Sequence, residues 1–421
     1  MEEMTRQGRG GQQNAHAGHG NPVSAAYGKA PKPHATEPRI PLLPPSLQRF
    51  SRPARHAGAA ITSVPSNTLR GDRMPESVLA SERVSAARSM NRVSTAYCQA
   101  RVVHSAVELG LFPFLAGRSA TAAEIVRGLG LHPRLTGDFL DSLVGLGFLE
   151  RDDDAGGYSN SVGAEEFLVP GSPLHLGGSM YSHATIHYHV WGKLTEALRD
   201  GHAKSGVIAD ASFQRSYKDP DHIRQFMDHM DGYASFVGHE LVNCVDWNSY
   251  ESFVDFGGAR GNIAMRLVKA HPHLRGGVFD LPEIKPLFDE HMEKHGTADR
   301  ITFHEGDFFE SPLPATNVAV IGHVLHDWPP SARARLIGRL GEAVRPGGML
   351  VVYDAMIDDA RRDPESLLQS LRCRMMREGG SEYTAAECGA WVEAAGFEVR
   401  RLLPVDTLTN DRILTAVKVA T

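Results

Sequence analysis

The chain has 421 residues, which is enough for two or three domains with a substantial core. Its net charge of −6 gives no general attraction to nucleic acid or to an anionic membrane. Four widely separated cysteines without a CxxC pair argue against a disulfide framework or a zinc ribbon, and favour a reducing, cytoplasmic compartment. There is no apolar run of the roughly 18 residues that a membrane span needs, and no signal-peptide core.

Residues 1–73 differ in composition from the rest of the chain. They are rich in glycine, proline and alanine and contain only four acidic residues. Such a segment cannot bury enough apolar surface to offset its ordering entropy. We expect either a disordered tail or an artefact upstream of a true translation start at Met74.

A mostly helical domain is expected over residues 74–175. Apolar residues at helical spacing between 79 and 116 predict one buried face, and Gly110 ends this helical stretch. The face is predicted to contain Cys98, Val102, Ala106 and Leu109. Thr121 and Glu124 then have the spacing of a capping box at the start of a further helix.

The next helix, over 133–146, precedes two short strands that flank a turn at 153–157. Helices followed by a β-hairpin are typical of a winged helix, a fold that often binds DNA. The would-be recognition helix carries Arg134 but also Asp138 and Asp141, so it offers no net positive charge to phosphates. A packing or dimerisation role is therefore favoured over nucleic-acid binding.

Residues 176–248 are expected to form a helical connecting region whose polar and aromatic side chains line a pocket. His183 and His187 stand four residues apart on a predicted helix, a spacing that also occurs in zinc sites. Because no neighbouring cysteine or acid completes a ligand set, we expect pocket lining or ordinary packing, and no metal.

Strand and helix patterns alternate over residues 249–421, which predicts an open, mainly parallel α/β sheet. Its strands are expected at 252–256, 275–280, 300–304, 317–322, 349–354, 397–402 and 412–418. Sheets of this kind bind ligands at the carboxyl ends of their strands.

Gly257, Gly258 and Gly261 directly follow the first of these strands, where glycine lets the backbone approach a ligand closely. Asp280 ends the next strand, where a carboxylate can accept both ribose hydroxyls. Asp307 follows the third strand, where it can accept the adenine amino group while an aromatic neighbour covers the ring.

Two features favour S-adenosylmethionine over NAD as the cofactor. The glycine spacing is not the GxGxxG of dinucleotide-binding loops. Asp255 would also place a carboxylate near the pyrophosphate of NAD, whereas a sulfonium and an amino-acid tail favour a carboxylate there.

From about Arg88 to Ala420 the chain resembles the S-adenosylmethionine-dependent O-methyltransferases that include plant caffeate and flavonoid enzymes and bacterial polyketide and phenazine enzymes. The motifs that carry the resemblance are Val254–Gly258, Phe279–Pro282, Gly306–Phe309 and Val324–Trp328. The resemblance implies a Rossmann-like methyltransferase domain with a mainly parallel seven-stranded sheet. It also implies a preceding winged-helix-like dimerisation domain, and hence a homodimer.

His326 is the expected general base, because a histidine with a near-neutral pKa suits removal of a phenol proton. The resemblance implies that Asp354 and Glu382 flank this base and orient it. It also implies cofactor contacts beyond the glycine and aspartate positions. These contacts are expected from Met230, Leu281, Phe308 and His323, the last in place of a lysine that plant members carry at position 322.

The expected reaction is methyl transfer to a hydroxyl group of a small secondary metabolite. We expect this hydroxyl to be aromatic. N- or C-methylation, a non-methylating reaction on the same fold and, less favoured, a DNA-binding regulator remain as alternatives. Arg372 and Arg374 depart from the usual substrate helix. We expect both to face solvent; if one faces the pocket instead, an acidic substrate is indicated.

Overall fold

The structure, a computed structural model, describes residues 76–206 and 219–419. The segment 1–73, with its two alternative interpretations, lies outside the described residues. The C-terminal half contains the expected α/β sheet, in the order β6-β5-β4-β7-β8-β10-β9. Its strands are β4 (Ser252–Phe256), β5 (Arg275–Asp280), β6 (Ile301–Glu305), β7 (Thr316–Gly322), β8 (Val344–Asp354), β9 (Phe397–Pro404) and β10 (Arg412–Lys418).

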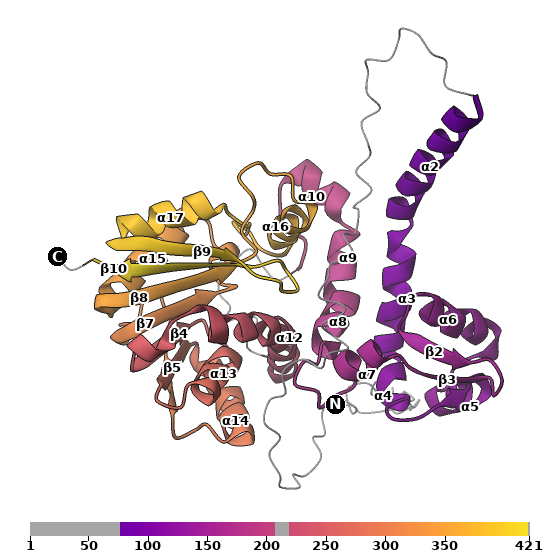
Figure 1. Cartoon of the computed structure of the whole chain (residues 1–421), viewed down its shortest axis with the longest axis horizontal. Coiled ribbons are helices and arrows are strands. Elements are labelled where there is room, and N and C mark those ends of the chain that lie inside the picture. The colour runs from indigo at the N-terminus through magenta and orange to yellow at the C-terminus, as the bar shows by residue number, and fades with distance from the viewer. Residues whose placement is uncertain (1–75, 207–218, 420–421) are drawn as a thin grey trace, which may run out of the picture. The chain divides into compact units, whose positions relative to one another are not determined.

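Strands β4 to β8 pair in parallel, and β10 runs antiparallel to both β8 and β9. The seven predicted strands are therefore confirmed, and so is the fold class. Helices cover both faces of the sheet (Figure 1). They are α13 (Asn262–Ala270), α14 (Lys285–His295), α15 (Pro330–Ala343) and α17 (Ala385–Ala394). A further helix, α16 (Pro364–Met376), contacts the segments Tyr188–Trp191 and Leu325–Asp327 instead.

Two apolar layers sandwich the sheet because successive strand residues point to opposite faces. Phe253 and Val318 join α13 and α14 in one layer. Val254 and Ala319, the next residue in each strand, join α15 and α17 in the other. This burial fixes the strand register and thereby the positions of the loops at the carboxyl ends of the strands.

A helical region precedes the sheet, as expected. Its elements are α8 (Gly177–Ser182), a π-helical turn (His183–His187), α9 (Tyr188–Trp191), α10 (Leu194–Asp200) and α12 (Pro220–Cys244). α8, the π-helical turn and α9 follow one another without a break. Such π turns occur frequently at functional sites, and this one carries both histidines of the His183–His187 pair.

The N-terminal domain has the expected helices followed by a hairpin. Its helices are α2 (Glu76–Ser94), α3 (Ala96–Glu108), α4 (Leu111–Phe114), α5 (Ala122–Leu129), α6 (Pro133–Gly145) and α7 (Val162–Leu168). Its strands are β1 (Ala120–Thr121), β2 (Leu149–Asp152) and β3 (Gly157–Asn160). The capping box is confirmed, since Thr121 and Glu124 exchange both hydrogen bonds. Asp141 binds Arg151 and the hydroxyl of Tyr158, so it joins α6 to the hairpin.

The predicted buried face of the first helical stretch is partly wrong. Cys98 is exposed and Leu109 is 37% exposed, although Ala106 is buried. The stretch is not one helix: α2 ends at Ser94, and α3 buries a face formed by Val103, Ala106 and Val107. Apolar residues surround most of α3, so spacing alone did not identify the face that packs. Gly110, in the left-handed conformation, separates α3 from α4 as expected.

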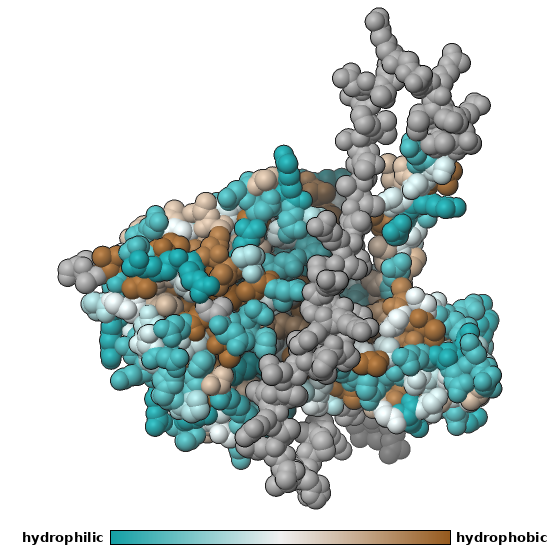
Figure 2. All heavy atoms as spheres, viewed as in Figure 1, coloured by the Kyte–Doolittle hydropathy of each residue, from teal (hydrophilic) through white to brown (hydrophobic). Residues whose placement is uncertain are grey.

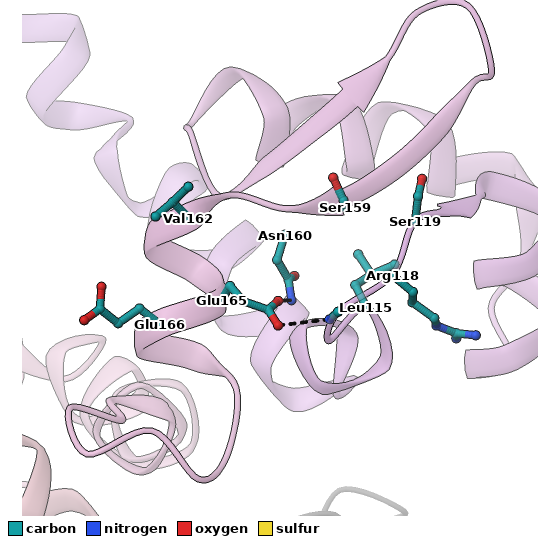
Figure 3. Close-up of a pocket in the computed structure, with 9 residues that line it drawn as sticks. Leu115, Arg118, Ser119, Ser159, Asn160, Val162, Glu165 and Glu166 are labelled. Carbon is teal, nitrogen blue, oxygen red and sulfur yellow. Dashed lines mark hydrogen bonds between the residues drawn. The ribbon is translucent and has the colours of Figure 1, made fainter. Parts of the chain in front are cut away.

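The surface shows hydrophobic side chains scattered among hydrophilic ones (Figure 2). In the part of the chain that the structure describes, every helix is too short or too polar to cross a bilayer. A surface pocket of the N-terminal domain lies between α7, β3 and the turn after α4 (Figure 3). Of its two carboxylates, that of Glu165 accepts hydrogen bonds from the backbone of Gly117 and the amide of Asn160, which indicates a structural role for Glu165.

Candidate active site

The turn after β4 is shaped by glycines that a side chain would disrupt. Gly257 has φ 74°, and a Cβ on it would lie 2.6 Å from Cγ2 of Val324. A Cβ on Gly258 would lie 2.7 Å from the carboxyl carbon of Asp255. Gly261 precedes the first residue of α13. The backbone at Gly258 therefore passes directly over the Asp255 side chain, an approach that only glycine allows.

Asp280 fastens this turn to the end of β5. Its two carboxylate oxygens accept hydrogen bonds from the backbone N–H groups of Ala259 and Leu281, both at 2.8 Å. Burial raises the pKa of Asp280 to about 6, although these two hydrogen bonds oppose the rise. Each oxygen keeps a free lone pair, so the carboxylate can still accept ribose hydroxyls as predicted. Leu281 itself packs with Ala259 and Phe226 beside the turn.

Asp255 is the feature that best fits a cationic cofactor. The side chain is buried, and its Oδ2 has no hydrogen-bond partner among the described residues. Burial, together with the charge of Asp280, raises the pKa of Asp255 to about 7. A buried carboxylate without a partner is costly, and a bound ammonium or sulfonium would remove that cost. The residues present therefore fit S-adenosylmethionine.

Arg260, which the sequence analysis missed, links the glycine turn to α12. Its guanidinium binds Asp228 at 2.8 Å and Asp231 at 2.6 Å, and these residues flank Met230. Met230 is half-buried and is thereby held on the helix that faces the turn. Its contact with the cofactor stays a prediction.

Asp307 and Phe308 lie in the turn after β6. The Asp307 carboxylate accepts a hydrogen bond from the backbone of Phe309 at 2.8 Å, which leaves its other oxygen for a ligand. The rings of Phe308, Phe309 and Trp328 pack together, with centroids 4.8 to 6.0 Å apart. An aromatic wall therefore stands between this turn and the segment that carries His326.

The predicted base and its two predicted acids converge on one nitrogen. Nδ1 of His326 lies 2.9 Å from Oε1 of Glu382 and 3.1 Å from Oδ1 of Asp354. Both carboxylates are buried. Burial disfavours the cationic ring, but the charges of Glu382 and Asp354 raise the pKa of His326 well above its ordinary value. With Nδ1 occupied by carboxylates, Nε2 is the nitrogen left to take a proton from a substrate.

Further contacts hold these acids in place. Tyr383 donates a hydrogen bond from its hydroxyl to Asp354 at 2.5 Å, and the backbone N–H of Glu382 donates to the hydroxyl of Ser370. The backbone N–H of Ser381 donates to the carbonyl of His326 at 2.8 Å. Because the loop with the acid is bonded to the segment with the base, the two cannot separate without breaking backbone contacts.

A buried arginine, Arg333 of α15, was not singled out from the sequence. Its guanidinium donates to the carbonyls of Leu325 and Trp328, on either side of His326. It also lies 5.0 Å from the ring centroid of Tyr383. No motif signals this residue, because its role depends on carbonyl groups that only the fold brings together.

His323 lies beside the proposed base and is paired with an aspartate. Its backbone has φ 52°, and its Nε2 lies 3.0 Å from Oδ1 of Asp411 on the strand-end loop before β10. The ring stacks on that of His326 at 5.9 Å, with an angle of 11° between the planes. Burial disfavours its charged form, but Asp411 raises the pKa of His323 above the ordinary value. The ring supports His326; its predicted contact with the cofactor stays a prediction.

Position 322 leaves no room for the lysine of the plant relatives. A Cβ on Gly322 would lie 2.0 Å from the Tyr353 ring, which is itself buried. The aromatic ring of Tyr353 packs edge-on against His323 at 5.2 Å. Tyr353 therefore fills the space beside the base-carrying turn.

Among the described residues, one cluster of possible metal ligands stands out. Atoms of His326, Cys373 and Glu382 lie within 4.8 Å of one another. Burial raises the pKa of Cys373 to about 12, so its sulfur is a neutral thiol at neutral pH and a poor metal ligand. The cluster is better explained as a base with its carboxylate partners.

His183 and His187 lie in an aromatic cluster that also contains residues of α12. The rings of His183, His187 and His229 lie 5.2 to 5.7 Å apart, and Tyr233 packs against His229 at 5.1 Å. Tyr233 also contacts the ring of His323 at 6.2 Å. The histidine cluster therefore continues to the base through aromatic contacts.

Together, a glycine turn over a buried aspartate and a carboxylate-bound histidine on a seven-stranded sheet define a methyltransferase-type site. A family model described as the O-methyltransferase domain matches residues 191–398, and one described as the O-methyltransferase dimerisation domain matches residues 92–170. The chain belongs to the S-adenosylmethionine-dependent O-methyltransferase family, and its cofactor is S-adenosylmethionine. The resemblance stated from the motifs is thereby confirmed.

The similar proteins include both O- and N-methyltransferases. The N,N-dimethyltransferase OxyT of Streptomyces rimosus is 46% identical over 80% of this chain and 97% of its own length. The tetracenomycin polyketide synthesis 8-O-methyl transferase TcmO of Streptomyces glaucescens is 44% identical over 76% of this chain and 95% of its own. The crystal structure of human N-acetylserotonin methyltransferase with SAM aligns with a TM-score of 0.73 and 26% identity, over 83% of this chain and all of that one.

Proposed function

We propose that this enzyme methylates a hydroxyl group of a small aromatic secondary metabolite, with His326 as general base. The observation that carries the proposal is the pair of carboxylates on Nδ1 of His326, at 2.9 and 3.1 Å. They fix the ring and stabilise its cationic form, which is what a base needs after it has taken a proton. Two similar proteins, TcmO and a 3-hydroxy-5-methyl-1-naphthoate 3-O-methyltransferase, are named for O-methylation of aromatic or polyketide compounds.

Bound S-adenosylmethionine supplies a methyl group on a positively charged sulfur. Nε2 of His326 takes the hydroxyl proton of the acceptor as the acceptor oxygen forms its bond to the methyl carbon. The carbon–sulfur bond breaks, which leaves a methyl ether, S-adenosylhomocysteine and an imidazolium. Glu382 and Asp354 balance the charge of that imidazolium until the proton is released to water. Alignment of the reacting atoms provides much of the rate.

We assign cofactor-binding roles to three carboxylates and to the glycine turn. Asp255 faces the cationic end of the cofactor, Asp280 accepts the ribose hydroxyls and Asp307 accepts the adenine amino group. Gly257, Gly258 and Gly261 keep the turn open. Leu281, Phe308 and Met230 contribute apolar contacts around it.

The test is formation of S-adenosylhomocysteine with a panel of phenols. We expect His326→Ala to lower kcat/KM by about 10²- to 10⁴-fold, the usual contribution of a general base. The exposed His239→Ala is the matched control and should behave as wild type. Wild-type turnover in His326→Ala on every accepted phenol would refute the general-base role.

N-methylation is the second candidate, since OxyT is named an N,N-dimethyltransferase and is 46% identical to this chain. The same base can remove a proton from an ammonium group. Mass spectrometry of products from matched aminophenols, with the methyl group located on oxygen or nitrogen, distinguishes the two. A C-methyl product or a product without a new methyl group would identify the remaining alternatives.

We also propose a homodimer formed by the N-terminal domain, with domain limits at 74–175, 176–248 and 249–421. The match to a dimerisation domain supports it. So does the exposure of large apolar side chains on α2 and α3, which a partner would cover. They are Val84, Met90, Val93 and Tyr97. Light scattering that shows a stable monomer at micromolar concentration would contradict this proposal.

A further inference from the structure

Arg372 does not face solvent, contrary to the sequence-based expectation. It is half-buried on α16, and its NH1 donates a hydrogen bond to the hydroxyl of Tyr233 at 3.1 Å. Its guanidinium carbon also lies 5.6 Å from the Tyr233 ring centroid. Arg374, two residues further along the same helix, is exposed as expected. The two arginines therefore have different environments and serve as a matched pair.

No carboxylate neutralises Arg372 in the described part of the chain. No aspartate or glutamate oxygen of residues 80–206 or 219–419 lies within 4.0 Å of its guanidinium nitrogens. A guanidinium has five N–H donors, and Tyr233 accepts from only one nitrogen. The free donors form a planar fork that matches the two oxygens of a carboxylate.

The neighbouring histidines add no second positive charge. Burial, followed by the charge of Arg372, lowers the pKa of His183 to about 4 and that of His187 to about 3. Both rings are therefore neutral at neutral pH and can act as hydrogen-bond donors or acceptors. Nε2 of His183 lies 3.0 Å from the Tyr233 hydroxyl, and Nδ1 of His187 is buried without a partner.

Arg372 and its neighbour Tyr233 are connected to the proposed base, His326, by two routes. Tyr233 packs against His323, which stacks on His326. Cys373, the residue after Arg372, places its sulfur 3.9 Å from the Glu382 carboxylate that holds the base. Arg372 is thus linked to His326 through the rings of Tyr233 and His323.

We propose that Arg372, with Tyr233 and His183, binds a carboxylate of the acceptor, so that the substrate is a hydroxylated aromatic acid. The inference rests on the proposed function, because it places the acceptor hydroxyl at His326. The fork of Arg372 donates to both carboxylate oxygens, and the Tyr233 hydroxyl orients the fork. An ionised enol of a polyketide presents a similar anionic oxygen, so it is the other acceptor group that Arg372 could bind.

The test compares each acceptor acid with its own methyl ester, which has the same ring and hydroxyl but no charge. Hydroxybenzoates and hydroxynaphthoates with their esters are the probes, together with 1,3-diketone phenols for the enol. We expect Arg372→Gln to lower kcat/KM for the acid about 10- to 100-fold, as for loss of a charge-assisted hydrogen bond. The kcat/KM for the ester should fall less than about 2-fold. Arg374→Gln should leave both unchanged.

Calorimetry separates this inference from the proposed function. If no phenol is methylated, binding of the acid and its ester to the protein saturated with S-adenosylhomocysteine gives the same comparison without turnover. Equal losses for acid and ester, or no preference for acids over esters in wild type, would overturn the inference. Weaker binding of S-adenosylhomocysteine by Arg372→Gln would overturn it as well, because Arg372 would then hold the cofactor carboxylate. A preference for the diketone alone would assign the enol instead.

Discussion

Arg333 donates two hydrogen bonds to Ser381, at 2.6 Å to its carbonyl and at 2.8 Å to its hydroxyl. Ser381 immediately precedes Glu382, and the same guanidinium binds the carbonyls on both sides of His326. One buried cation thus holds the proposed base and its carboxylate partner at a fixed separation. We regard Arg333 as a positioning residue, since it contacts none of the reacting atoms.

Arg333→Gln should therefore weaken both the fold and the chemistry. Loss of a buried guanidinium that makes four hydrogen bonds is expected to lower the free energy of unfolding by about 3 kcal/mol. Displacement of the base by about 1 Å would lower kcat by roughly 10²-fold. Denaturant unfolding and saturating kinetics measure the two effects. Arg335→Gln, on the exposed face of the same helix, is the control. An unchanged kcat in a destabilised Arg333→Gln would limit the residue to a structural role.

The pH profile should show the influence of Glu382. Because the pKa of His326 is raised well above its ordinary value, the neutral base prevails only at higher pH and activity should increase as pH increases. Glu382→Gln removes one of the charges that raise this pKa. The rising limb of the activity–pH curve should move toward pH 6.5, about the ordinary pKa of histidine, while the maximal activity falls. The exposed Glu393→Gln should keep the wild-type profile.

Stability gives an independent measure of the same pKa. A histidine whose pKa is raised in the folded state stabilises the fold fully below about pH 6.5, its unfolded value. That contribution is lost as pH rises through the folded pKa. The loss should be smaller in Glu382→Gln than in wild type. Identical pH dependence of unfolding in the two proteins would show that Glu382 does not raise the His326 pKa.

Cofactor affinity should depend on the ionisation of Asp255. Its pKa of about 7 means that the carboxyl group is increasingly protonated as pH falls below neutral. If it faces the cationic end of S-adenosylmethionine, binding should weaken from pH 8 to pH 6. Asp255→Asn should bind about 10- to 100-fold more weakly at pH 8, for loss of a buried charge pair. Its remaining pH dependence should centre near 6, the pKa of Asp280. Asp289→Asn, on the surface, is the calorimetric control.

Thr121→Ala tests the local stability of the N-terminal domain. The substitution removes the hydrogen bond from the backbone of Glu124 to the threonine hydroxyl and the one from that hydroxyl to the Glu124 carboxylate, which keeps its bond to the backbone N–H of residue 121. N-cap losses of this kind cost about 1 kcal/mol. We expect a lower melting temperature and unchanged kcat, because the cap makes no contact with the site. Thr121→Ser, which keeps the cap, should melt as wild type does.

The sequence was informative where function depends on residues adjacent to strand ends. Glycines after β4 and Asp280 at the end of β5 were found because a strand followed by a turn has a local pattern. His326, Asp354 and Glu382 were placed together by resemblance to a family, and the structure brings both carboxylates within 3.1 Å of Nδ1 of His326.

Long-range partners were not predictable in this way. Arg260 binds Asp231, 29 positions away, and Arg333 binds Ser381, 48 positions away, and no spacing rule reports such pairs. The orientation of Arg372 depends on Tyr233, 139 residues earlier. Helical periodicity also failed to choose between two faces of α3, because tertiary packing decides which apolar residues are covered.

The collision between Gly322 and Tyr353 constrains the order in which this site could have diverged from enzymes with a side chain at position 322. A Cβ there would overlap the tyrosine ring at 2.0 Å, so no residue larger than glycine is compatible with Tyr353 in its present position. A lineage that acquires a lysine at 322 must first replace Tyr353 by a smaller residue. Exchange of Gly322 for lysine alone should therefore fail in this enzyme, whereas the same exchange together with a smaller residue at position 353 should be tolerated.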